Sequence, residues 1–196
     1  MKGYKIAVGI DKEYGPFPVM VELDIPEDAI VVVPEDKVAV EVENCSDVGY
    51  RILPRTEVKL IQKCRTNKVK VVGMYPLMSF VSKWNHKAYS FFELNKIRAC
   101  LYGNPYYNFD CITIYSIGAE LFETVWRSKK QSCGPGINYF ESAEDAENYY
   151  YCDTNSWALN LMHRFRNIWC SLLLECFDER FKKAMLILSK EGELDE

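Results

Sequence analysis

Short runs of β-branched residues, interrupted every few positions by proline or glycine, make up residues 1–75. Such runs are typical of strands, and the interruptions are typical of turns. In Lys68–Val71 charged and β-branched residues alternate strictly, which places both lysines on one face of a strand. This part of the chain is therefore predicted to be a mainly antiparallel β structure, with strands at residues 3–10, 19–25, 29–33, 37–42, 57–62 and 69–74.

The middle of the chain gives weaker patterns. Residues 79–84 fit either a strand or a helix, whereas residues 91–101 predict a helix. Ser142 is a good N-cap with Asp145 three residues later, so a short helix is expected from there to about Tyr150. Further strands are expected at residues 112–115, 119–125 and 137–140.

From Asp153 the apolar residues recur with helical spacing. A second amphipathic stretch spans Phe181–Leu188. The favoured architecture is one α+β domain over residues 1–196, with a β-rich body at 1–150 and a helical C-terminal extension at 151–196. The apolar faces of the extension fit either core packing or a homodimer interface, and the interface candidates are Trp157, Phe165, Trp169 and Phe181. The clustered tyrosines likewise fit either a protein-binding surface or packing against these helices.

Composition limits the class of partner. The chain has 48% hydrophobic residues, which is enough for a sizeable core and too many for a disordered chain. Its net charge is −4, so it lacks the overall positive field that attracts nucleic acids. Two basic clusters are expected to lie on solvated strand or loop faces: Lys63, Arg65, Lys68 and Lys70, and Arg127, Lys129 and Lys130.

Neither a signal peptide nor a membrane segment is expected, because the longest apolar runs are far shorter than the ~20 residues of a membrane span. We therefore expect a cytoplasmic protein. The eight cysteines include no Cys-x-x-Cys pair, and the two histidines lie far from any paired cysteines. Reduced, mostly buried thiols are expected, without a metal site or a cofactor.

Four segments carry a resemblance to a known family. They are residues 3–5 with 21–29, the basic strand Lys63–Val72, the turn Tyr115–Leu121, and Cys133–Phe140 with Glu144–Tyr149. In this order they resemble a domain of unknown function that is commonly found beside pentapeptide repeats in phage, bacterial and large-DNA-virus proteins. The resemblance covers most of residues 3–150, although 36–60 and 76–105 contribute little to it. The repeats themselves are absent from the chain.

The resemblance implies a phage or viral setting, with the host cytosol as the compartment, and it implies no particular reaction. One position departs from the family pattern, because Asn138 stands where the family usually has histidine. Asparagine cannot act as an acid or a base, whereas its amide can replace a hydrogen-bonding histidine.

The candidate ligand-binding residues come from these same segments. Cys133 precedes a Gly-Pro-Gly loop whose backbone N–H groups could bind an anion. As a nucleophile its thiol would need a neighbouring base, and only His86 and His163 are available, so a buried structural cysteine is favoured. The full set is Tyr4, Lys63, Arg65, Tyr115, Cys133, Gly136, Asn138 and Tyr139.

No catalytic constellation is evident, so the favoured function is that of an accessory protein that binds a host protein or a small ligand. The alternative is an enzyme similar to ADP-ribosyltransferases or another nucleotide-processing enzyme. In the ADP-ribosyltransferase reading, Tyr4 or Lys5, then Tyr115 or Tyr139, and then Glu144 or Glu147 would occupy the active-site positions. This alternative rests on analogy of fold alone. A virion structural component is a weaker third hypothesis.

Overall fold

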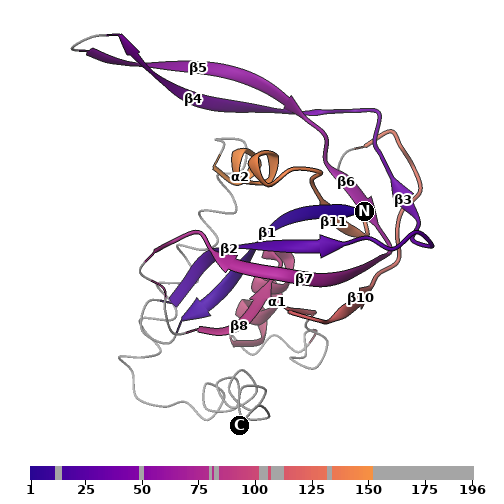
Figure 1. Ribbon diagram of the computed structural model, residues 1–196. Helices are drawn as coiled ribbons and strands as arrows, with labels where there is room; N and C mark the ends of the chain where they lie inside the picture. The colour runs from indigo at the N-terminus through magenta and orange to yellow at the C-terminus, as the bar shows by residue number, and fades with distance from the viewer. Residues whose placement is uncertain are drawn as a thin grey trace. The chain divides into compact units, whose positions relative to one another are not determined.

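The computed structural model describes residues 1–11, 15–48, 51–79, 81, 84–101, 106, 113–131 and 134–151. In this part the chain is rich in strands and has two helices, α1 (Phe91–Leu101) and α2 (Ala143–Tyr151) (Figure 1). The strands are β1 (Lys2–Asp11), β2 (Gly15–Asp24), β3 (Val31–Val32), β4 (Val38–Val48), β5 (Arg51–Ile61), β6 (Cys64–Thr66), β7 (Lys68–Pro76), β8 (Trp84–Tyr89), β9 (Ile114–Ser116), β10 (Glu120–Phe122) and β11 (Ile137–Tyr139). The predicted α+β class is confirmed at this level.

The described strands form three sheets. Their orders are β10-β7-β2-β1-β8-β9, β11-β6-β3 and β4-β5. Pairing is antiparallel between β1 and β8, β8 and β9, β7 and β10, β6 and β11, β3 and β6, and β4 and β5. The prediction of mainly antiparallel pairing agrees with each of these registers.

The chain divides into two compact units. The first takes its described residues from Met1–Ile6, Met20–Met74 and Gly118–Trp157, and the second from Ala7–Val19 and Tyr75–Ile117. The expectation of a single domain stays a prediction. The predicted C-terminal helices, with Trp157, Phe165, Trp169 and Phe181, lie outside the described residues.

Alternation along β7 follows the sequence pattern. Val69 and Val71 are buried, whereas Lys70 between them is exposed. The two lysines of this stretch lie on the outward face, where Lys68 pairs with Asp28 at 2.9 Å. The prediction for this strand is confirmed.

The sequence pattern failed at two places. The predicted strands at 37–42 and 57–62 are the bases of a much longer hairpin, whose register runs from Val38 opposite Ile61 to Val48 opposite Arg51. Strand β8 was not predicted either. It contains His86 with a φ of 53°, a left-handed conformation that breaks the alternation on which strand prediction depends.

Both described helices begin where the sequence indicates. The backbone N–H of Asp145 donates to Ser142 Oγ at 3.0 Å, as predicted for an N-cap at the start of α2. In α1 the N–H of Glu93 donates to Ser90 Oγ at 3.3 Å. Both short helices therefore have a fixed N-terminus.

The second unit buries a charge that the sequence did not single out. Glu93 is buried on α1, where its carboxylate accepts from Lys96 Nζ at 2.8 Å and from the backbone N–H of Thr113 at 3.2 Å. These contacts fasten the helix to the chain that leads into β9. Tyr115 lies on β9, opposite Ala88 of β8, and is also buried.

Candidate functional site

The candidate site is built on the three-stranded sheet of the first unit. Its central strand, β6, is fully buried, with β11 on one side and β3 on the other. Arg65 lies opposite Asn138 of β11 and opposite Val32 of β3. Because opposite residues of an antiparallel pair share a face, Arg65 and Asn138 project from the same side of the sheet.

Arg65 is among the largest fully buried side chains of the described residues. Its Nε donates to the carbonyl of Trp126 at 2.9 Å, its Nη1 to the carbonyl of Gln131 at 2.8 Å, and its Nη2 to the carbonyl of Ser128. All three acceptors belong to the described residues 123–131 and 134–136 between β10 and β11, here called the anchored loop. The sequence-based expectation that Arg65 lies on a solvated face is wrong, because these carbonyls provide buried partners that spacing along the chain cannot reveal.

Asn138 holds the far end of the same loop. Its Nδ2 donates to the carbonyl of Gly136 at 3.2 Å and to that of Gly134 at 3.4 Å. Its Oδ1 is buried and has no hydrogen-bond partner among the described residues. The Asn138 side chain therefore acts as a hydrogen-bond donor to the loop backbone. This is the role that the sequence leaves open for an asparagine at this position.

Backbone hydrogen bonds fix the loop further. The N–H of Glu123 donates to the carbonyl of Asn67 at 2.9 Å, and that of Trp126 donates to the carbonyl of Pro135 at 3.0 Å. The carbonyl of Lys129 accepts from Glu35 N–H at 2.8 Å. Connections in compact domains are mostly about 4–6 residues long, and a longer loop with its own fixed shape is usually functional.

Gly136 closes the loop in a conformation that favours glycine. Its φ is +123°, and a Cβ there would lie 3.0 Å from Val125 Cγ2 and 3.3 Å from the carbonyl oxygen of Thr66. The close approach of the loop to β6 therefore depends on the absence of a side chain. Gly136, a predicted site residue, contributes to the shape of the loop.

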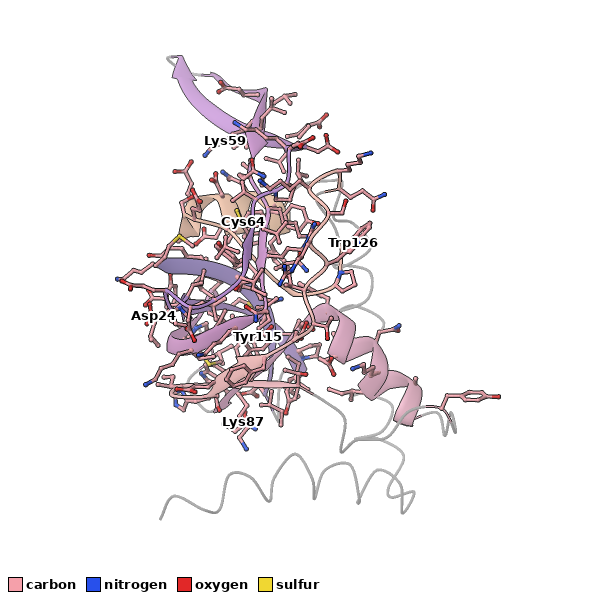
Figure 2. The ribbon with its side chains drawn as sticks, turned by 90° about the vertical axis from the view of Figure 1, so that its right-hand side faces the viewer. Asp24, Lys59, Cys64, Lys87, Tyr115 and Trp126 are labelled. Atoms are coloured by element: carbon pink, nitrogen blue, oxygen red, sulfur yellow. The ribbon has the colours of Figure 1, made fainter. Side chains whose placement is uncertain are left out.

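The outer surface of the anchored loop is cationic and carries an aromatic side chain. Arg127, Lys129 and Lys130 are exposed, as predicted for this cluster. Trp126 is 43% exposed, and its ring centroid lies 5.8 Å from Arg65 Cζ (Figure 2). A partly exposed tryptophan beside three cations forms a surface suited to an acidic partner. Trp126 was missed from the sequence, although its position next to Arg127 could have indicated it.

The other face of β6 carries Cys64 and Thr66, both buried. Cys64 lies opposite Tyr139 and is a free, buried thiol. Burial and, to a lesser extent, the Glu141 carboxylate raise the pKa of Cys64 to about 11, and burial likewise raises the pKa of Tyr139. A thiol of this kind is a poor nucleophile near neutral pH. The side chains of the other seven cysteines, Cys133 among them, are not among the described ones.

Lys63 and Tyr4 belong to the edge of this region. Lys63 Nζ donates to the hydroxyl of Tyr149 at 3.1 Å and lies 4.6 Å from the centroid of its ring. Tyr149 in turn packs against Phe140 with ring centroids 5.1 Å apart. The backbone of Tyr4 pairs with that of Phe140 through hydrogen bonds of 2.7 and 2.8 Å. Lys63 and Tyr4 therefore contact the residues that pack around α2. Both lie away from the anchored loop.

Helix α2 is attached to the hairpin by charge. Lys59 of β5 pairs with Glu144 at 2.8 Å and with Asp145 at 3.0 Å, and these carboxylates raise the pKa of Lys59 (Figure 2). Strand β4 also contacts the helix. Glu144, weighed as an active-site acid in the enzyme alternative, thus has an ion-pair partner.

The predicted site residues divide into three groups. Arg65, Gly136 and Asn138 come together at the anchored loop, whereas Tyr4, Lys63 and Tyr139 lie elsewhere in the first unit. Tyr115 belongs to the second unit, and Cys133 is outside the described residues. Within the described part of the chain, no group of three or more His, Cys, Asp or Glu residues is arranged to hold a metal ion. No helix among the described residues is long and apolar enough to cross a membrane.

Comparisons with protein-family models, with curated proteins and with solved structures found no match to this chain.

Proposed function

We propose that the chain is a non-enzymatic binding protein, and that its recognition element is the anchored loop. The partner that we propose is an acidic segment of another protein. The viral or phage setting that the family resemblance suggests would make this a host protein.

The buried guanidinium of Arg65 is the observation that carries the proposal. Burying a charge is unfavourable unless it is paired or fully hydrogen-bonded. The three hydrogen-bond acceptors of Arg65 among the described residues are backbone carbonyls of one loop, and none is a carboxylate. The three hydrogen bonds from Arg65 hold the backbone of the anchored loop in one conformation. A loop that is already in its binding conformation loses less conformational entropy on binding.

The outer surface of the loop indicates the chemistry of the partner. Arg127, Lys129 and Lys130 attract carboxylates, and the exposed face of Trp126 adds apolar contact area. Nucleic acid would also fit a cationic aromatic loop. The net charge of −4, however, opposes the approach of a long polyanion more strongly than that of a short acidic protein segment.

A binding assay with a defined probe tests the proposal. The probe is a fluorescein-labelled peptide of alternating Glu and Ala, followed by fluorescence anisotropy. Replacing the three loop cations together, R127A/K129A/K130A, is expected to weaken binding about tenfold, because each exposed charge pair contributes up to about 1 kcal/mol.

The matched control removes the same number of exposed cations elsewhere in the chain, as K2A/K37A/K70A, and should leave the affinity within about twofold. Equal weakening by both variants would show unspecific charge attraction and contradict the proposal. Tighter binding of an oligothymidylate of equal charge would identify a nucleic-acid partner instead.

The enzyme alternative needs its own measurement. A thermal-shift screen with NAD and common nucleotides at millimolar concentration would reveal a binding site as a higher melting temperature. We expect no shift, since the carboxylate of Glu144 is already paired with Lys59. A clear shift with NAD would favour the nucleotide-processing enzyme.

A further inference from the structure

The hairpin of β4 and β5 is a two-stranded sheet with two outer edges. The strands pair along their whole length, and no third described strand joins them (Figure 1). A two-stranded hairpin is marginally stable alone, and an outer edge with unpaired N–H and C=O groups is a template for another strand. The hairpin therefore offers sites for strand addition.

Its two edges are not equivalent. Strand β5 contains Pro54, which has no N–H and is tolerated in a strand where the ladder needs no donor. The outer edge of β5 consequently lacks a donor at this position. Strand β4 contains neither proline nor glycine, so its outer edge is continuous from Val38 to Val48.

Strand β4 also has a two-sided sequence. Val40 is fully buried, and Val38 and Val42 share its face by register. Glu41 is exposed on the opposite face. Every charged residue of β4 is acidic.

On the face that carries Glu41, strand β5 contributes exposed apolar side chains. Val58 lies opposite Glu41 and is 61% exposed, and Leu60 lies opposite Ala39 and is 60% exposed. Exposed apolar side chains beside carboxylates complement a surface that is both basic and apolar.

We infer that the outer edge of β4 binds an extended segment of a partner protein in which basic residues alternate with β-branched residues. Added antiparallel to β4, such a segment places basic side chains on the face that carries Glu41. Its β-branched side chains then extend the face of Val38, Val40 and Val42. Main-chain hydrogen bonds supply affinity, and the alternating side chains supply specificity. A second copy of β4 is a poor occupant, because the antiparallel registers that keep the valines of both copies on one face also place carboxylates opposite carboxylates.

This site is separate from the anchored loop and has the opposite charge preference, so it is tested with a different probe. The probe is a fluorescein-labelled peptide of alternating Lys and Val that matches β4 in length. The neutralising variant E41Q/E43Q/D47N removes every negative charge of β4, and it is expected to bind the peptide about tenfold more weakly than the unaltered chain. A peptide of the same composition with all lysines at one end should bind at least about tenfold more weakly than the alternating one.

A third peptide separates strand addition from charge attraction alone. It keeps the alternating sequence but carries N-methyl groups on every second residue, which removes the donors of one edge. We expect it to lose most of the binding when the methylated edge is the one that faces β4, so both methylation registers are measured. Equal binding of both methylated peptides and the parent would overturn the inference. So would an unchanged affinity of the neutralising variant, or a dimer in analytical ultracentrifugation that the peptide fails to dissociate.

Discussion

Arg65 and Asn138 lie opposite each other on β6 and β11, and each binds a different stretch of the same loop. Arg65 donates to the carbonyls of Trp126, Ser128 and Gln131, and Asn138 donates to those of Gly134 and Gly136. One pair of facing residues thus fixes both ends of a cationic surface, and the pair is the natural first target for mutation.

Replacing Arg65 by lysine should destabilise the protein although the charge is kept. A single ammonium cannot reach three carbonyls, and carbonyls that lose their donor remain partly buried, so we expect the free energy of unfolding to fall by about 2–3 kcal/mol. Urea denaturation measures the change. The exposed Arg127→Lys is the control and should shift stability by less than about 0.5 kcal/mol. Equal effects of the two variants would show that Arg65 has no special role.

Two glycines with positive φ give a matched comparison. Gly118 has a φ of +87° and open space around it, whereas at Gly136 an added Cβ would also approach Val125 and the Thr66 backbone. Gly118→Ala should therefore cost about 1–2 kcal/mol from backbone strain alone. Gly136→Ala should cost more, and it should also weaken the acidic-peptide binding. The reverse order in thermal or urea denaturation would contradict the structure of the loop.

Cys64 predicts a loss of stability at alkaline pH. Its pKa is about 11 in the folded protein against an ordinary value of 9.0, because burial opposes the thiolate. The unfolded chain therefore loses its proton first. The stabilisation is complete below about pH 9 and is lost as pH rises towards 11. Burial raises the pKa of Tyr139 as well, which adds a change of the same sign.

The measurement is urea denaturation across this pH range, with Cys64→Ala as the control. The variant should show a smaller alkaline decline than the unaltered chain. In parallel, iodoacetamide near neutral pH should label Cys64 only after unfolding, as mass spectrometry of its peptide would show. Rapid labelling of Cys64 in the native protein would contradict its burial.

Two variants at helix α2 compare the stability contributed by an N-cap with that contributed by surface ion pairs. Ser142→Ala removes the acceptor of the Asp145 N–H and should cost about 1 kcal/mol. Lys59→Ala removes two ion pairs that are largely open to solvent, and it should cost less. Hydrogen exchange of the α2 amides should therefore accelerate more in the serine variant. A larger effect of the lysine variant would mean that the hairpin contact, and not the cap, holds the helix.

Local chemistry explains what could be predicted from the sequence. The alternation at Lys68–Val71 and the cap at Ser142 act within a few residues, and both are found in the structure. The long hairpin was only half predicted, because the part of β4 after Val42 has polar residues that pairing with β5 accommodates and that periodicity does not indicate. Strand β8 was not predicted for a related reason. One residue in a left-handed conformation, His86, interrupts the alternation of buried and exposed side chains along the strand.

In the candidate site, too, local features could be predicted from the sequence and contacts between distant segments could not. Asn138 and Gly136 lie in a segment that the sequence had singled out, and Gly136 has the positive φ that suits a loop glycine. The role of Arg65 could not be predicted, since its acceptors are carbonyl oxygens, which every residue possesses. Only the folded arrangement of β6 and the anchored loop shows which carbonyl oxygens accept the hydrogen bonds of Arg65. Trp126 was overlooked because its exposure depends on that same approach.

The partners of Arg65 lie 61, 63 and 66 residues further along the chain. Closing a segment of that length carries an entropic penalty before any hydrogen bond forms. The ordered loop should therefore be a late product of folding that arises only after β6 and β11 have met. A synthetic peptide covering the loop alone would lack its shape, so inhibitors or antibodies raised against such a peptide should recognise the native protein poorly.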